Sequence, residues 1–237
     1  MYLLNMVGWN PSTRAWAASR RGSSHVRNED AYCLLDAPRG AGGGDRRGAI
    51  YAVSDGVSTG GMGHWASDVA ISRIRQFYER ESTGSADTLT EIIGEIDWEL
   101  RGHESGKAAC TLVAIWVVQG QVHLFQVGDS HVFRIRGDEV HKITQGEPGA
   151  GSGLDKFMGM GPAVAEVMYT VSGPVQAGDV FVLATDGVTE ILDPNELPAL
   201  WNRSGRDPAA CAEAIVGAAA RAQVDDDATA LVAMVLG

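Results

Sequence analysis

Acidic side chains recur in four short segments spread over almost the whole 237-residue chain. The segments are Asn28-Glu29-Asp30, Ser54-Asp55-Gly56, Thr185-Asp186-Gly187 and Asp225-Asp226-Asp227. Carboxylate oxygens are hard ligands that suit Mg²⁺ or Mn²⁺, and two cations held roughly 3.5 to 4 Å apart need several of them. Folding could therefore gather these acids into one two-metal hydrolytic site.

Two of the acids occupy the same kind of position. Asp55 closely follows the apolar run 49–53, Asp186 closely follows the apolar run 180–184, and a glycine comes directly after each. A carboxylate at a strand end can meet a cation together with a neighbouring backbone carbonyl, although a single Asp-Gly pair is more typical of a plain turn. The recurrence at two strand ends favours a shared site.

The remaining acids leave alternatives open. Glu29 and Asp30 precede a short strand at 31–35, so in extended backbone they would point to opposite faces, and on their own they would be read as a surface loop. Three adjacent aspartates at 225–227 repel one another unless solvated or bound to a cation, and the sequence does not rank Asp226 against Asp227. Asp129 is typical of a hairpin turn and matters only if that turn faces the other acids.

The elements that must position these residues come in blocks. The dipeptides Gln119-Gly120 and Gly137-Asp138, each with one glycine, predict tight hairpins. Apolar side chains at helical spacing predict helices around 65–78, around 89–100 and over 208–223. This arrangement predicts an α+β sandwich with antiparallel sheets. The glycine-rich stretches 36–48 and 145–161 are expected to be loops, the second a candidate flap over the site. Apolar runs rich in β-branched residues predict strands at 49–53, 111–118, 121–127, 131–135, 180–184 and 229–236.

Composition excludes some classes of function. The net charge of −11 and the absence of a long Lys/Arg run argue against nucleic-acid binding. The three cysteines lack CxxC spacing, so reduced, buried thiols and a cytoplasmic location are expected. No apolar run approaches the roughly 18 residues of a membrane span, and the apolar start of the chain is too short for a signal peptide. We therefore expect no membrane insertion, and a monomer.

Taken in order, the segments resemble the metal-dependent 2C-type serine/threonine protein phosphatases (the PPM family), especially the compact bacterial members. The resemblance covers about residues 17–236 and includes Val53-Ser54-Asp55-Gly56, Val127-Gly128-Asp129-Ser130 and Asp226-Asp227-Ala228-Thr229. It implies a single domain over 1–237 with a short N-terminal extension at 1–13. The implied fold is a four-layer α-β-β-α sandwich with two central antiparallel sheets.

The resemblance also implies roles for the acids in hydrolysing phosphoserine and phosphothreonine on proteins. Asp55 would bridge two Mn²⁺ or Mg²⁺ ions, Glu29 and the Gly56 carbonyl would hold one, and Asp186 with Asp226 would hold the other. Asp30 would orient the attacking water, and Asp129 with Asp186 could hold a third, looser ion as in some relatives. The implied partners are phosphorylated proteins that a serine/threonine kinase modifies.

The chain departs from the family where phosphate is bound. The family usually places an arginine three residues before the asparagine of the Asn-Glu-Asp segment, whereas this chain has His25 there and Arg27 two residues later. We expect Arg27 or His25 to bind substrate phosphate, with Arg20 and Arg21 as further alternatives. His64 stands where an acid is common and is more typical of a surface residue at a helix start.

These departures leave two other hypotheses. One is a catalytically impaired PPM-fold regulatory module that binds phosphoproteins. The other is a phosphatase of the same superfamily that acts on a regulatory phosphoprotein of the anti-anti-sigma type.

Overall fold

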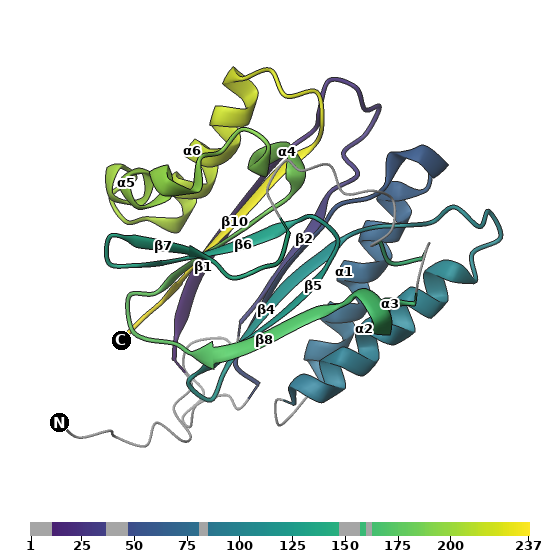
Figure 1. Ribbon diagram of the computed structural model, residues 1–237, viewed down its shortest axis with the longest axis horizontal. Coiled ribbons are helices and arrows are strands. Elements are labelled where there is room, and N and C mark those ends of the chain that lie inside the picture. The colour runs from purple at the N-terminus through teal and green to yellow at the C-terminus, as the bar shows by residue number, and fades with distance from the viewer. Residues whose placement is uncertain (1–10, 37–46, 81–84, 147–156, 160–162) are drawn as a thin grey trace.

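Two antiparallel sheets of five strands each pack face to face, and helices cover both outer faces, as the computed structural model shows (Figure 1). The structure describes residues 11–36, 47–80, 85–146, 157–159 and 163–237. The first sheet has the order β1-β10-β9-β6-β7, and the second has the order β2-β3-β4-β5-β8. The strands are β1 Thr13–Arg20, β2 Ala31–Leu35, β3 Ala49–Ser54, β4 Leu112–Val118, β5 Gln121–Val127, β6 His131–Arg136, β7 Glu139–Lys142, β8 Tyr169–Pro174, β9 Val180–Ala184 and β10 Ala228–Val235.

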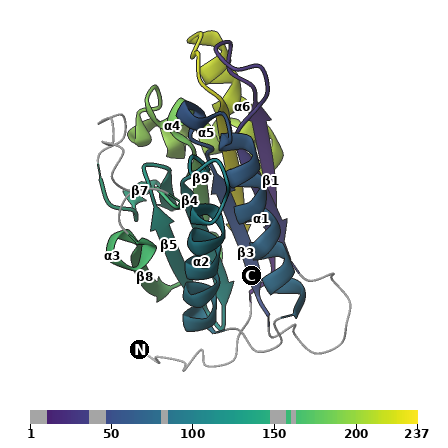
Figure 2. The same cartoon turned by 90° about the vertical axis from the view of Figure 1, so that its right-hand side faces the viewer.

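Helices α1 and α2 lie side by side over the second sheet (Figure 2), and α4, α5 and α6 cover the first. Helix α6 starts where the sequence carries standard start signals: the Asp207 side chain accepts the Ala210 N–H at 3.0 Å, and Pro208 is the first helical residue. The helices are α1 Gly63–Arg80, α2 Ala86–Arg101, α3 Val164–Val167, α4 Asp186–Thr189, α5 Leu197–Arg203 and α6 Pro208–Arg221, with 3-10 turns at Ser58–Gly60 and Pro194–Glu196.

Three apolar layers explain why several strands are apolar on both faces. One layer lies between α1, α2 and the second sheet, another between α6 and the first sheet, and the third between the two sheets. Tyr51 and Val53 of β3 face the other sheet, whereas Ile50 and Ala52 face the helices. All six residues of β3 are buried, because helices and a second sheet cover its two sides. The predicted four-layer α+β sandwich is confirmed.

The predicted strands and helices are found within three residues of their expected bounds. The hairpin at Gln119-Gly120 is confirmed, since both residues have positive φ angles of 51° and 72° and join the antiparallel strands β4 and β5. Gly137 likewise joins β6 to β7. The strands β1, β7 and β8 were not predicted, because they lie at sheet edges and carry exposed side chains instead of an apolar run.

The hairpin interpretation of Gly128-Asp129-Ser130 is wrong. The segment leaves β5 in the second sheet and enters β6 in the first, so it carries the chain across the sandwich. Strand β5 pairs with β4 and β8, and β6 pairs with β7 and β9. Adjacent strand signals in sequence look the same in both cases, because the pairing partner depends on packing between the sheets. Asp129 therefore lies in the segment that crosses from one sheet to the other.

Most of the two predicted loops, 36–48 and 145–161, and most of the predicted extension 1–13 lie outside the described residues. Residues 157–159 of the second loop and the start of α3 at Val164 are anchored to the rest of the fold. Met158 is buried and pairs with Cys110, and the buried Asp97 of α2 accepts the N–H groups of Gly159 at 2.7 Å and Val164 at 3.2 Å. None of the described helices combines the length and apolar character that a membrane crossing requires.

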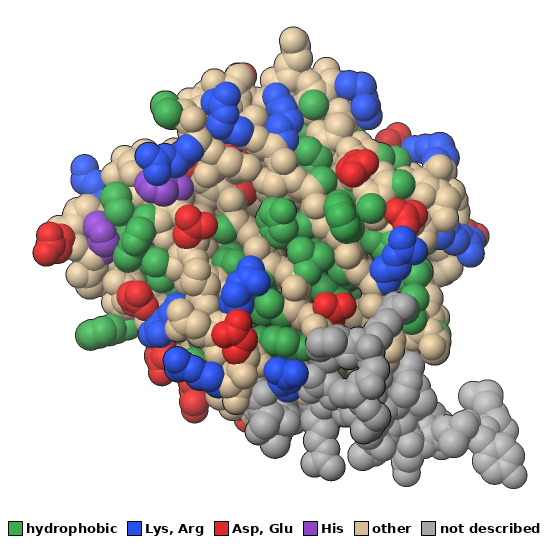
Figure 3. Space-filling model, turned by 180° about the vertical axis from the view of Figure 1, so that it is seen from behind, with side chains coloured by type: hydrophobic (Ala, Val, Ile, Leu, Met, Phe, Trp, Pro, Cys, Tyr) green, Lys and Arg blue, Asp and Glu red, His purple; other side chains and the backbone are tan. Residues whose placement is uncertain are grey.

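Lys and Arg side chains are interspersed with acidic and apolar ones on the face opposite to that of Figure 1 (Figure 3). No concentrated basic area is visible on that face. The exposed apolar side chains of the protein include Trp16 of β1 and Tyr32 of β2, which belong to edge strands of the two sheets.

Candidate metal centre

Asp55 follows β3 directly, and its backbone is held on both sides. The Asp55 N–H donates to Thr111 Oγ1 at 3.0 Å, and the Thr111 N–H donates to the Asp55 carbonyl at 2.8 Å. Ser54 Oγ donates to the Thr111 carbonyl at 2.6 Å. The main chain is therefore fixed by the start of β4, and the Asp55 carboxyl group projects beyond the strand end.

Asp186 meets Asp55 from the opposite sheet. It follows β9 and begins the short helix α4, and its carboxyl group lies within hydrogen-bonding reach of the Asp55 carboxyl group. Its Oδ1 atom is buried and has no hydrogen-bond partner among the described residues. The ends of β3 and β9 therefore face each other, as a site shared by these two acids requires.

Glu29 and Gly56 converge at the first residue of α1. The Glu29 carbonyl accepts Ser67 Oγ at 2.6 Å and the Gly56 N–H at 3.1 Å, which ties this segment to α1 and to the end of β3. A Cβ atom on Gly63 would lie 2.9 Å from Glu29 Oε2 and 2.6 Å from the Gly56 carbonyl oxygen. The glycine therefore leaves space in which these two oxygens lie together, and they are the two donors expected to share one ion.

Asp30 points toward the first sheet, away from Glu29, as the predicted alternation requires. Its Oδ2 atom accepts Thr185 Oγ1 at 3.0 Å, and Thr185 Oγ1 in turn accepts the Thr229 N–H at 3.0 Å. Its Oδ1 atom is buried and has no partner among the residues that the structure describes. Asp30 is thus fixed by one oxygen and presents the other to the acid cluster.

The structure gives Asp226 and Asp227 different roles, a distinction that the sequence could not make. Asp227 is buried and accepts three donors: the N–H of Gly22 at 2.7 Å, the N–H of Glu29 at 2.6 Å and His25 Nδ1 at 2.8 Å. Asp226 is more exposed, and its Oδ1 accepts the Asp227 N–H at 2.8 Å. Asp227 therefore organises the Asn-Glu-Asp segment, which sequence reasoning missed, and Asp226 remains the candidate ligand.

His25 lies at the rim of the cluster with both ring nitrogens engaged. Nδ1 contacts Asp227 at 2.8 Å, and Nε2 lies 3.1 Å from Ser58 Oγ. Burial alone would lower the pKa of His25, but the hydrogen bond to Asp227 and the charges of Asp227, Asp226 and Glu29 raise it above 6.5. The imidazolium is thereby favoured, in which both nitrogens donate.

The carboxyl groups in the centre of the cluster repel one another. Burial raises the pKa of Asp55 well above its ordinary value, and the charges of Asp30, Asp186 and Asp226 add to this effect. Burial, with Asp227 and Asp186, raises the pKa of Asp30 to about 8 despite its threonine partners. Burial, with Asp129 and Asp226, raises the pKa of Asp186 to about 6. The acids are held together at a cost in free energy that a bound cation would offset.

The other predicted site residues lie around this centre. Asp129 is near enough to Asp186 to raise the pKa of that residue. Arg27 is exposed at the surface two residues before Glu29. His64, the second residue of α1, is half-buried, and its carbonyl accepts Ser67 Oγ at 3.2 Å, which fits its predicted position at a helix start.

Divalent cations fit this donor set. The central donors are carboxylate and carbonyl oxygens, which suit Mn²⁺ and Mg²⁺, and two of them, Asp30 Oδ1 and Asp186 Oδ1, are buried with no partner among the described residues. His25, Asp226 and Asp227 also offer ligand atoms within 4.8 Å of one another. We regard that second group as an ion pair, because Asp227 already accepts three hydrogen bonds.

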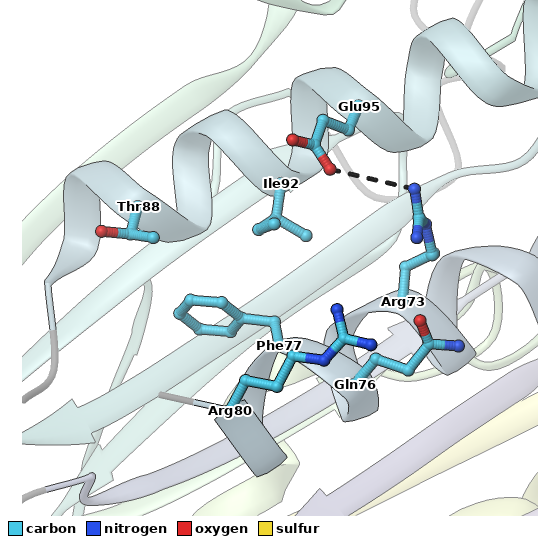
Figure 4. Close-up of a pocket in the computed structure, with 7 residues that line it drawn as sticks. All are labelled: Arg73, Gln76, Phe77, Arg80, Thr88, Ile92 and Glu95. Carbon is cyan, nitrogen blue, oxygen red and sulfur yellow. Dashed lines mark ion pairs between the residues drawn. The ribbon is translucent and has the colours of Figure 1, made fainter. Parts of the chain in front are cut away.

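A pocket of about 280 Å³ lies elsewhere, between α1 and α2 (Figure 4). Phe77 of α1 and Ile92 of α2 form its apolar part, and Arg73 and Glu95 form an ion pair of 3.8 Å across it. None of the acids of the candidate metal centre lines it.

Comparison with known families identifies the class of protein. The family model described as protein phosphatase 2C matches residues 21–231. Because this match spans most of the sequence, the chain belongs to the protein phosphatase 2C family, whose members are serine/threonine phosphatases and hence hydrolases. The resemblance inferred from the sequence is thereby confirmed. No match was found among curated proteins.

Solved structures share the fold. The catalytic domain of the phosphatase PstP, in complex with two manganese ions, has a TM-score of 0.77 and 20% identity over 95% of this chain and 99% of that chain. PppA, a regulatory component of T6SS in Pseudomonas aeruginosa, has a TM-score of 0.75 and 24% identity over 95% and 99%. The phosphatase MsPP from Mycobacterium smegmatis, in complex with cacodylate, has a TM-score of 0.73 and 22% identity over 94% and 98%.

Proposed function

We propose that the chain is an active phosphatase that hydrolyses phosphoserine and phosphothreonine on proteins and depends on two Mn²⁺ or Mg²⁺ ions. The observation that carries this proposal is the cluster of carboxyl groups of the half-buried residues Asp30, Asp55 and Asp186, in which Asp30 Oδ1 and Asp186 Oδ1 are fully buried. The charges of Asp30 and Asp186 raise the pKa of Asp55, and the charge of Asp186 also raises the pKa of Asp30. None of the three forms an ion pair with Lys or Arg among the described residues. A scaffold without cations gains nothing from such repulsion.

The residues divide between two ions. Glu29, the Gly56 carbonyl and Asp55 would hold one, and Asp55, Asp186 and Asp226 the other, with Asp129 and Asp186 available to a third. Bound divalent cations would supply Lewis acidity, which lowers the pKa of water and offsets charge on the phosphoryl oxygens. The two manganese ions in the PstP structure support this proposal.

Asp30 would act on the water that attacks phosphorus. Thr185 holds Oδ2, so the free Oδ1 can accept a hydrogen bond from a water molecule and fix its direction of attack. The three cysteines Cys33, Cys110 and Cys211 are buried, and burial raises the pKa of each thiol. A thiolate nucleophile is therefore disfavoured. The buried free thiols also support the cytoplasmic location that we propose.

The substrate phosphate requires a cation, for which the sequence offers Arg27 and His25. Arg27 is exposed and could make bidentate hydrogen bonds to phosphate. We further propose that the phosphorylated substrates are products of a serine/threonine kinase and that the protein acts as a monomer.

A phosphopeptide hydrolysis assay with Mn²⁺ tests the proposal. The wild-type protein should release phosphate, and Asp55→Ala should lose most of the activity because both ions lose a ligand. Asp225→Ala, which changes an exposed neighbouring acid, is the matched control and should retain activity. Activity that survives Asp55→Ala would rule out the two-metal mechanism.

The alternative is a catalytically impaired regulatory module that binds phosphoproteins, and one observation favours the impaired catalysis. Both ring nitrogens of His25, which replaces the usual arginine, are engaged with protein groups. A calorimetric titration with Mn²⁺ separates the two functions, since the module would take up no ion at millimolar concentration.

A further inference from the structure

Four side chains from three separate segments of the sequence form a continuous series of contacts at the rim of the metal centre. Asp227 Oδ2 lies 2.8 Å from His25 Nδ1, and His25 Nε2 lies 3.1 Å from Ser58 Oγ. Ser58 Oγ in turn donates to Glu29 Oε2. This series of contacts therefore begins at the buried Asp227 and ends at the carboxylate of Glu29, which we assign to the ion that the Gly56 carbonyl also binds.

The chemistry of these groups gives this series of contacts a direction. Carboxylate oxygens accept hydrogen bonds, so His25 donates to Asp227 and Ser58 donates its single hydroxyl hydrogen to Glu29. The remaining lone pairs of Ser58 Oγ then face His25 Nε2. Every member has a defined partner, which fixes the rotamers of all four side chains.

We propose that Ser58 and His25 are positioning residues that hold the Glu29 carboxylate toward the ion it shares with the Gly56 carbonyl. This inference rests on the proposed two-metal function. Glutamate has three rotatable side-chain bonds, and a ligand held in one orientation loses less entropy when the ion binds. The Glu29 backbone is fixed independently by Ser67, Gly56 and Asp227, so Ser58 acts on the carboxylate alone.

The same contacts also decide whether His25 can bind the substrate phosphate. A ring whose two nitrogens contact Asp227 and Ser58 has no free N–H for a phosphate oxygen. His25 therefore acts through Ser58, and Arg27 becomes the cation that meets substrate phosphate.

Ser58→Ala tests the proposal by Mn²⁺ titration calorimetry on the metal-free protein. Loss of a hydrogen bond to a metal ligand costs roughly 10- to 100-fold in metal affinity, so one of the two Mn²⁺ sites should weaken by that factor and the other should not change. Ser58→Thr retains the hydroxyl group and should restore the affinity. Thr59→Ala removes a hydroxyl from the next residue of the same 3-10 turn, and it should behave as wild type.

His25→Asn separates the two roles of the histidine. The asparagine amide can still donate to Asp227 from about the position of Nδ1, but it does not reach Ser58. The variant should reproduce the weakened Mn²⁺ site of Ser58→Ala, and its KM for a phosphopeptide at saturating Mn²⁺ should remain within about twofold of wild type. A raised phosphopeptide KM with unchanged Mn²⁺ affinity would instead make His25 a phosphate ligand and overturn the proposal.

Two failures can be distinguished. If the wild type binds two Mn²⁺ ions and Ser58→Ala binds both equally well, the positioning role is wrong and the metal centre stands. The same conclusion follows if Thr59→Ala weakens binding as much as Ser58→Ala, because the effect would then belong to the turn. If the wild type binds no Mn²⁺, the proposed function itself fails, and the inference fails with it.

Discussion

Replacing Asp30 by asparagine should stabilise the metal-free protein while it lowers activity. Burial and neighbouring acids raise the pKa of Asp30 to about 8, against 3.8 for a free aspartate. Between these two pH values the folded protein binds a proton that the unfolded chain does not. The free energy of unfolding therefore falls as pH rises, by up to about 1.4 kcal/mol per pH unit. Asparagine cannot ionise, and it can still accept the hydrogen bond from Thr185.

The size of the gain follows from the pKa. At pH 7 the penalty removed from the wild type is at most about 4 kcal/mol, and relaxation around the cluster reduces it, so we expect about 2 to 4 kcal/mol. For a domain of this size, that corresponds to a rise of roughly 5 to 15 °C in Tm. The gain should be close to zero at pH 4, where the unfolded chain is also partly protonated.

Urea unfolding at pH 5, 6, 7 and 8 with a chelator measures this gain. Asp225→Asn, at an exposed acid beside the cluster, is the matched control and should follow the wild type. Added Mn²⁺ should shrink the difference between Asp30→Asn and wild type, because cations offset the repulsion. A difference that does not grow between pH 5 and pH 7, or a variant less stable than wild type at pH 7, would refute the reasoning.

Three further predictions concern ion binding, a glycine beside the site and an ion pair outside it. Mn²⁺ at 100 times its dissociation constant should raise the free energy of unfolding by about 2.7 kcal/mol, and a chelator should reverse the rise in a thermal melt; no change in Tm would contradict a built metal centre. Gly187→Ala should weaken Mn²⁺ binding in calorimetry, since a Cβ there would collide with the Asp227 carbonyl, whereas Gly173→Ala, with open space around it, should not. Arg136→Ala should destabilise the fold by about 3 kcal/mol in urea, because it strips the buried Asp179 of two hydrogen bonds of 2.6 Å, and Mn²⁺ affinity should stay unchanged; equal stability would contradict this role of the ion pair.

The layers of the fold could be predicted from the sequence because the long apolar runs belong to strands that are fully buried. Strand β5 and strand β9 have the bounds predicted from their apolar runs. Edge strands such as β1 gave no such signal, because Trp16 and its neighbours are partly exposed and alternate irregularly. The turn at Asp129 was misassigned because strand order, which decides between a hairpin and a crossing, depends on packing of the two sheets.

The candidate site likewise contains residues that the sequence could predict and residues that it could not. Asp55 and Asp186 could be predicted because each follows an apolar strand and precedes a glycine. The roles of Asp227 and Ser58 could not be predicted from the sequence. An aspartate that accepts three hydrogen bonds from a loop looks the same in sequence as a solvated one. The one usable signal was the run of three aspartates, whose repulsion requires that some member be neutralised by partners.

The most direct test of the account is a crystal soaked in Mn²⁺ and measured by anomalous diffraction at the manganese edge. The account predicts two peaks, both in contact with the Asp55 carboxylate, one beside Glu29 and Gly56 and the other beside Asp186 and Asp226. A single peak held by His25, Asp226 and Asp227, with Asp55 and Asp186 still in contact with each other, would contradict it.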